Sequence, residues 1–160
     1  MASQSDIAHG LKEVARRASV ISTAFGEDNW NTTLPGQDWS THDLYCHLAA
    51  TGANLPELVS VALDPPPDPP PLDVDAWNDS QVSARRAQSK TKILAEIQDG
   101  HDRAATRIKL LADDEISREV RAPWGEMVPL GDLLMDIVVG HENRHLDQLD
   151  EMLKSGAISG

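Results

Sequence analysis

The sequence predicts an all-α protein, a four-helix bundle, and three observations lead to this prediction. Four segments place apolar residues at steps of three and four, the spacing of one helix face. No segment alternates apolar and polar residues convincingly, so no strand is expected. Aromatic residues make up only 4% of the chain, so Leu, Ile, Val and Ala must fill the core. Such a core suits helices better than sheets.

The first helix is expected over about residues 5–25, where apolar residues follow one face and charged residues lie on the others. A connector rich in turn-forming residues follows over 26–39. The second helix is expected to begin after Ser40, a favourable N-cap residue, with Asp43 at the third helical position. It must end by Asp64, because prolines follow and a proline has no backbone N–H to continue the helix.

The stretch 64–73 reads DPPPDPPPLD and predicts a stiff, extended connection between the second and third helices. The third helical region is expected over 75–112, with a break near Gln88, because Ser89 can cap a second piece. The fourth helix is expected over about 129–156, since proline is tolerated in a first turn and glycine favours a helix end. Four amphipathic helices cannot bury their apolar faces separately, so we expect them to form one bundle.

The composition excludes several classes of protein. The net charge is −12, and no cluster of Lys and Arg offers the cationic surface that a nucleic-acid-binding protein needs. An acidic membrane surface would be repelled for the same reason. We see no secretory signal and no uncharged apolar run of the ~18 residues that a spanning helix needs. The single cysteine, Cys46, allows no intrachain disulfide. We therefore expect one cytoplasmic domain over 1–160, with neither nucleic acid nor membrane as a partner.

Three histidines are candidate metal ligands. His141 and His145 lie four residues apart on the fourth helix, about 40° apart around its axis, so both imidazoles can meet one ion. His47 is expected to face inward from the second helix. If these two helices are neighbours, three imidazoles converge, and neutral imidazoles bind divalent ions such as Zn²⁺ or Ni²⁺. The alternative is that each histidine packs in the core and donates to a carbonyl or to water.

The segment 141–145, HENRH, also matches the HExxH motif of zinc peptidases, in which Glu142 would be the general base. A metallopeptidase is the weaker alternative, because no strands are expected around the motif. A third ligand at Glu151 would need a glycine turn, but Gln148 stands there inside a continuing helix.

Two stretches, LPGQDWSTHDLYCHLAA at 34–50 and PWGEMVPLGDLLMDIVVGHENRHLDQL at 123–149, resemble the DinB-like helical-bundle superfamily. This superfamily includes YfiT-like proteins and the N-terminal metal-binding domain of mycothiol-dependent maleylpyruvate isomerase. The resemblance implies an up-down-down-up bundle and a homodimer. It also implies a metal site in which His47, His141 and His145 match the family's ligands. The isomerase has a glutamate where this chain has His141, so the chain follows the three-histidine version.

The resemblance suggests a divalent-metal-dependent enzyme that acts on a small molecule. The reaction would be either thiol-dependent transfer or isomerisation, with a low-molecular-weight thiol as a second cofactor, or hydrolysis. The alternative is a non-catalytic bundle that binds metal or serves as a scaffold. Because histidine ligands must be neutral, metal affinity is expected to fall as the pH drops through roughly 6.5.

The sequence also predicts the environment of several other residues. Cys46 is expected to be a small packing residue, His9 and His42 to be exposed, and His101 to lie on an apolar helix face without a second ligand. The side chains expected to contact the three ligands or to line the pocket are Glu142, Gln148, Asn78, Trp77, Trp39 and Trp124.

Overall fold

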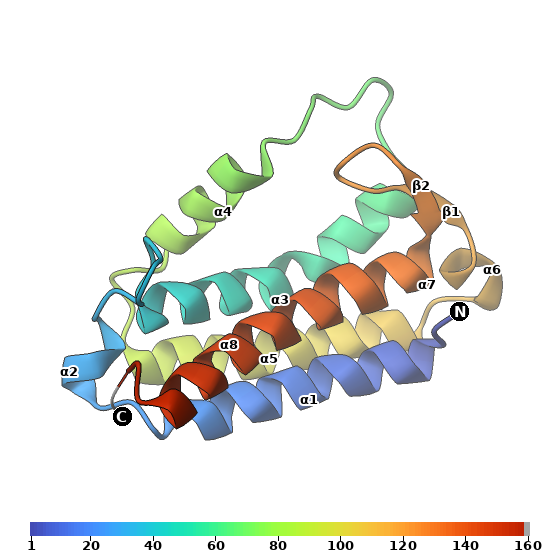
Figure 1. Ribbon diagram of the computed structural model, residues 1–160. Helices are drawn as coiled ribbons and strands as arrows, with labels where there is room; N and C mark the ends of the chain where they lie inside the picture. The colour runs from blue at the N-terminus through green and yellow to red at the C-terminus, as the bar shows by residue number, and fades with distance from the viewer. Residues whose placement is uncertain (159–160) are drawn as a thin grey trace.

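The structure, a computed structural model, describes residues 1–158 and is mostly helical. Four long helical runs lie side by side (Figure 1). Helix α5 packs against both α3 and α1, while α8 and the π-helix η1 that precedes it pack against α1. These runs are α1 (Gln4–Ser22), α3 (Thr41–Leu63), α5 (Lys90–Lys109) and the C-terminal run of α7 (Leu130–Asp132), η1 (Leu133–Val139) and α8 (Gly140–Ser155).

Capping residues set the helix starts where the sequence predicts them. Ser40 Oγ accepts a hydrogen bond from the Asp43 amide at 3.1 Å, and Asp43 Oδ2 accepts one from the Ser40 amide at 3.0 Å. Helix α3 ends at Leu63, and Asp64 caps it before the prolines begin at Pro65. The third region is broken as expected, into α4 (Val74–Ser83) and α5, and Ser89 Oγ accepts from the Lys92 amide at the start of α5.

Residues 119–129 form an antiparallel hairpin of β1 (Glu119–Arg121) and β2 (Met127–Pro129), so the expectation of no strand is wrong here. Each strand has three residues, and only Val120 is buried among them, which is too short a pattern for alternation to reveal. Gly125, with φ +96°, lies in the turn. The fourth helix is also not uniform, because the π-helix η1 lies between α7 and α8.

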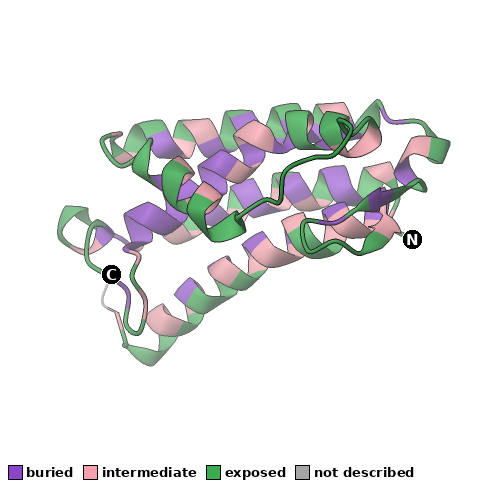
Figure 2. Cartoon of the chain, turned by 90° about the horizontal axis from the view of Figure 1, so that it is seen from above, coloured by how far each residue is buried: buried purple, intermediate pink, exposed green. Residues whose placement is uncertain are grey.

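The apolar core lies between the long helices, whose outward faces are exposed (Figure 2). Two short helices, α2 (Glu27–Trp30) and α6 (Asp113–Ile116), each add one buried residue. Helix α4 buries only Val82, and the segment 64–73 before it is exposed and contains no helix or strand. None of the helices within residues 1–158 is long and apolar enough to cross a membrane. The largest fully buried side chains are Tyr45, Ile7, Leu11, Leu44, Leu48, Leu55, Ile93, Ile97, Ile108, Leu130, Leu146 and Leu149.

Candidate metal centre

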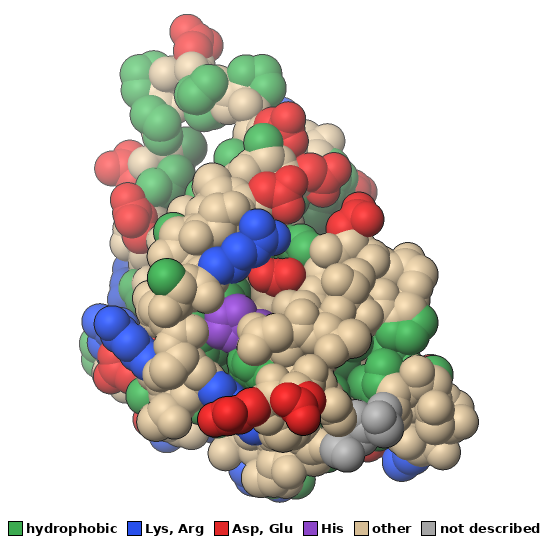
Figure 3. Space-filling model, turned by 90° about the vertical axis from the view of Figure 1, so that its left-hand side faces the viewer, with side chains coloured by type: hydrophobic (Ala, Val, Ile, Leu, Met, Phe, Trp, Pro, Cys, Tyr) green, Lys and Arg blue, Asp and Glu red, His purple; other side chains and the backbone are tan. Residues whose placement is uncertain are grey.

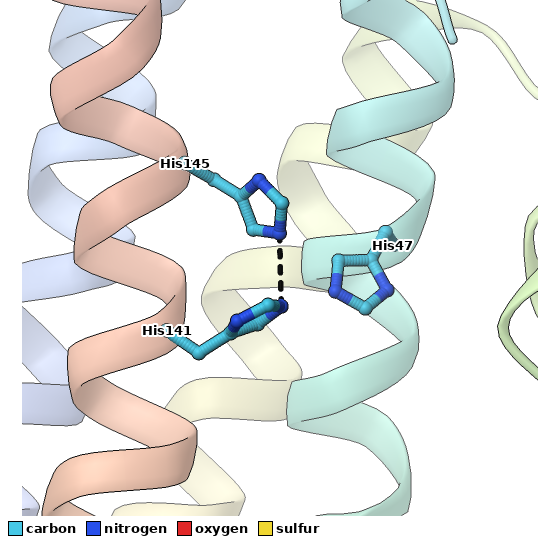
Figure 4. Close-up of side chains that lie close together, drawn as sticks. All are labelled: His47, His141 and His145. Carbon is cyan, nitrogen blue, oxygen red and sulfur yellow. Dashed lines mark hydrogen bonds between the residues drawn. The ribbon is translucent and has the colours of Figure 1, made fainter. Parts of the chain in front are cut away.

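Helices α3 and α8 bring three histidine side chains together. His47 comes from α3, and His141 and His145 come from the first two turns of α8, with all three rings pointing toward one another (Figure 4). One ring nitrogen of each lies within 4.8 Å of a ring nitrogen of the other two. His141 Nε2 and His145 Nε2 are 2.9 Å apart. The four-residue spacing on α8 explains why these two rings share a face.

The three histidines of the cluster differ in burial. His47 is 5% exposed, whereas His141 and His145 are half-buried. The Trp39 ring, in the loop before α3, packs 5.3 Å from the His47 ring, centroid to centroid. His141 and His145 are therefore the more accessible part of the cluster, and His47 is the more buried part.

All three imidazoles are neutral at pH 7. Burial lowers the pKa of His47 to about 3, and the nearby His145 and His141 contribute to this shift. Burial lowers the pKa of His145 to about 4, and burial also lowers the pKa of His141, with Arg144 adding to both shifts. We therefore expect metal affinity to fall at a pH lower than 6.5, because protons compete with the ion for these nitrogens only near or below their lowered pKa values.

The donor set fits a divalent ion. Both ring nitrogens of His47 are buried without a hydrogen-bond partner within residues 1–158, and a bound ion would satisfy one of them. Tetrahedral ligands at Zn–N distances of about 2.0–2.1 Å lie about 3.3 Å apart, so nitrogens within 4.8 Å of one another would need to approach by at most about 1.5 Å to share one ion. A ring nitrogen that donates in the His141–His145 contact cannot also bind an ion, so both rings would bind one through Nε2 as their Nδ1–H tautomers.

A family model of the DinB superfamily matches residues 11–149. The chain belongs to the DinB superfamily. This confirms the family expected from the sequence, although a comparison with curated proteins gave no significant match.

Two solved structures share the fold of this DinB-superfamily chain. YfiT from Bacillus subtilis, described as a probable metal-dependent hydrolase with an unusual four-helix bundle topology, is 21% identical, with a TM-score of 0.79. The match covers 98% of this chain and 89% of YfiT. Mycothiol-dependent maleylpyruvate isomerase is 15% identical, with a TM-score of 0.71, over 93% of this chain and 63% of the isomerase. The chain therefore spans less than two thirds of the isomerase.

Glu142 belongs to the core of this DinB protein and not to the metal centre. Its side chain is fully buried, and its Oε1 lies 2.9 Å from His101 Nε2. The geometry therefore disfavours the peptidase alternative, in which Glu142 would activate water beside the metal. His101, expected on an apolar helix face without a second ligand, has this carboxylate as its hydrogen-bond partner.

Of the other side chains expected at the site, Trp39 alone has a ring contact with one of the three histidines. Within residues 1–158, no hydrogen bond or ring contact joins the rest to those histidines. Gln148 is exposed, and Trp77 and Asn78 are half-buried on α4. Trp124 is exposed and donates its indole N–H to Glu126 in the hairpin.

His42 is buried, so the expectation that it is exposed is wrong, whereas His9 is exposed as expected. His42 Nδ1 accepts the indole N–H of Trp30 at 2.6 Å, and its Nε2 lies 3.1 Å from the Arg86 carbonyl. Cys46 is fully buried, and burial raises the pKa of its thiol to about 12, which excludes a thiolate at neutral pH. The expectation that Cys46 is a packing residue is confirmed.

Proposed function

We propose that this DinB-superfamily protein is a metal-dependent enzyme that acts on a small molecule, with His47, His141 and His145 as the ligands of one divalent ion. The observation that carries the proposal is the convergence of three neutral imidazoles within 4.8 Å, one of them with both nitrogens buried and unpartnered. Zn²⁺ and Ni²⁺ are the favoured ions, because both bind neutral imidazole.

The residues of the chain define what such a site can do. A bound divalent ion lowers the pKa of a coordinated water or thiol, which supplies a nucleophile near neutral pH. His47 anchors the inner side, and the half-buried His141 and His145 leave the outer side open to substrate. Glu142 is engaged by His101 and Cys46 is buried, so neither provides a nucleophile or base. The nucleophile must therefore come from solvent or from a small-molecule thiol.

Two reaction classes fit this site. A low-molecular-weight thiol would serve in transfer or isomerisation, a class supported by the name of the isomerase with the same fold. Water would serve in hydrolysis, a class supported by the description of YfiT. The substrate is a small molecule in both cases.

The first experiment measures bound metal per chain after purification without a histidine tag. We expect about one equivalent in the wild type, and its loss in His141→Ala. His9→Ala is the matched control, because His9 is exposed on α1 and should leave the metal content unchanged. Equal metal content in wild type and His141→Ala would contradict the ligand set. Assays of the loaded protein with thiols plus electrophiles, and with hydrolysable esters and amides, then separate the two reaction classes.

A non-catalytic metal-binding or scaffold bundle is the second candidate. It is favoured by the lack of a free acid or base among the described residues that contact the three histidines. A loaded protein whose turnover with every substrate class equals that of His145→Ala would support this candidate over the enzyme.

We also infer one domain over 1–160 with an up-down-down-up order of helices, and a homodimer. The long connection through 64–73 and α4 supports the helix order, because it gives α5 enough chain to run in the same direction as α3 (Figure 1). The homodimer rests on the family resemblance alone, and light scattering of the purified protein tests it.

A further inference from the structure

A second polar pair is buried in the core, and one of its members, Glu142, directly follows the candidate ligand His141 in the sequence. His101 on α5 and Glu142 on α8 are both 0% exposed, and Glu142 Oε1 is 2.9 Å from His101 Nε2. His101 Nδ1 lies 2.8 Å from the Ile97 carbonyl. Because a carbonyl oxygen only accepts, Nδ1 carries a hydrogen and donates it, and this bond fixes the plane of the ring. Both nitrogens of His101 are thus engaged.

The pair joins α8, which carries His141 and His145, to α5, which packs against the His47-bearing helix α3. Glu142 directly follows His141 on α8. On α3, Gly52 faces the His101 ring so closely that a Cβ at this position would lie 2.5 Å from Nδ1. Gly52 is five residues beyond His47 on the same helix. His101 is therefore held against α3 on one side and bonded to α8 on the other.

A buried polar pair of this kind is weak evidence for a role in stability. Well-packed apolar side chains of similar volume often stabilise a core as well or better, because they carry no cost of removing polar groups from water. A hydrogen bond does have a direction, however, and an apolar contact does not. The other buried side chains of α8, Leu146 and Leu149, are apolar and would tolerate small rotations of the helix.

We propose that His101 and Glu142 form a positioning pair, whose hydrogen bond fixes the rotation of α8 about its axis so that His141 and His145 point at His47. Successive residues of a helix are about 100° apart, so a rotation that broke this bond would also turn both candidate ligands away from α3. The inference rests on the proposed function, since it concerns the geometry of the same three-histidine site.

The test replaces the polar pair by an apolar one in the double variant His101→Leu/Glu142→Leu. Two properties are compared with the wild type: the Zn²⁺ affinity, by competition with a chelator, and the nuclear Overhauser contact between the ring protons of His47 and His145 in the metal-free protein. We expect a folded protein in which Zn²⁺ binds about 10–100-fold more weakly and the ring contact is lost.

Two further variants separate positioning from general stability. In Glu142→Gln the amide can donate to the Nε2 of neutral His101, so affinity and ring contact should return to wild-type values. Asp150→Ala is the matched control on the same helix, because it removes an exposed hydrogen bond from Lys154 that lies within α8 and does not join α8 to another helix. It should leave both properties unchanged.

A folded double variant that keeps the wild-type affinity and ring contact would overturn the proposal. If the leucine pair does not fold, His101→Asn replaces it, because the shorter amide can keep the bond to the Ile97 carbonyl but cannot reach Glu142. The same loss is expected there, and unchanged values would again overturn the proposal. If the wild type itself binds neither Zn²⁺ nor Ni²⁺, the proposed function fails, while the ring contact in the metal-free variants still decides the positioning role.

Discussion

His47 is a buried imidazole without a hydrogen-bond partner for either ring nitrogen within residues 1–158. A polar group buried in this way costs free energy in the metal-free protein. Replacing His47 by Leu, which has a similar size, should therefore raise the free energy of unfolding of the metal-free protein by about 1–2 kcal/mol while abolishing metal binding. Urea unfolding measures the first effect. An ordinary core histidine would give a loss of stability in the same variant, and the exposed His9→Leu should change little.

The lowered pKa values of the cluster predict a loss of stability in acid. With a folded-state pKa of about 3 against about 6.5 in the unfolded chain, the stability of the metal-free protein does not depend on the ionisation of His47 above pH 6.5. Stability falls as the pH drops from 6.5 toward 3, because the unfolded chain takes up a proton that the folded chain excludes. Between pH 7.5 and 5.5 the loss amounts to about 1.4 kcal/mol for one such histidine.

Comparison with His47→Leu isolates this effect, since every other titrating group is common to both proteins. Among these groups is His101, whose burial alone would lower its pKa, but whose pKa is raised overall by Glu142 and by its hydrogen bonds. Its contribution has the opposite sign, being present below pH 6.5 and lost as the pH rises through its folded-state pKa. A metal-free wild type and His47→Leu that lose equal stability between pH 7.5 and 5.5 would contradict the prediction.

At the scale of helices, the contact between α3 and α5 depends on a glycine. A Cβ at Gly52 would lie 2.5 Å from His101 Nδ1 and 3.1 Å from the His101 backbone nitrogen, and backbone cannot move aside as a flexible side chain can. Gly52→Ala should therefore destabilise the protein by about 1–3 kcal/mol through overpacking. A loss of stability in Gly52→Ala would be informative, because alanine ordinarily stabilises a helix interior by about 0.5–1 kcal/mol relative to glycine.

Thermal or urea unfolding of Gly52→Ala measures this change. Gly26→Ala is the control, because a Cβ there would meet nothing within 4 Å and the backbone of Gly26 has a negative φ. Its stability should change far less than that of Gly52→Ala. A Gly52→Ala protein as stable as the wild type would show that α5 can shift away from α3 at no cost.

The sequence predicts those elements whose signals are local. Ser40 and Ser89 mark helix starts because their side chains bond to backbone groups three residues away, and the prolines after Asp64 mark a helix end. The hairpin over 119–129 is missed because its strands have three residues each, and the π-helix η1 carries no separate pattern. Both depend on how the chain packs between α6 and α8.

At the candidate site, too, the sequence predicts what depends on local spacing and misses what depends on how the helices pack. The proximity of His141 and His145 follows from their spacing on one helix, whereas their approach to His47 requires that α3 and α8 are neighbours. The pairing of His101 with Glu142 depends on a contact between α5 and α8 that no local pattern reveals. The burial of His42 likewise depends on Trp30, which reaches it from the short helix α2.

At the scale of the whole molecule, the charge is consistent with a small-molecule ligand and not with a polyanion. The chain carries a net charge of −12. On the face shown in Figure 3, acidic side chains gather in the upper half and basic ones are scattered. A polyanion would meet repulsion over such a surface. Arg144 is a cation that acts on both His141 and His145, so a small anionic substrate would meet a local positive charge beside the candidate centre.

A bound ion would join two parts of the bundle that pack largely on different partners. Helix α3 packs mainly against α5, whereas α8 packs against α1 and η1, and the candidate ligands are divided between α3 and α8. An ion held by both helices binds only the folded chain, so it stabilises the whole molecule by mass action. Free Zn²⁺ at 100 times its dissociation constant should add about 2.7 kcal/mol. At about 2–4 °C per kcal/mol for a chain of this size, the Tm should rise by about 5–10 °C.

Differential scanning calorimetry with and without Zn²⁺ measures this rise, and a chelator should reverse it. His141→Ala should show no rise, whereas His9→Ala should behave as the wild type, since His9 is exposed on α1, far along the chain from both ligand-bearing helices. An equal rise in His141→Ala would assign the stabilisation to ions on the acidic surface. A rise confined to proteins that keep all three histidines would instead require one ion that joins α3 to α8, because no pair of ligands on α8 alone could hold the two halves of the bundle together.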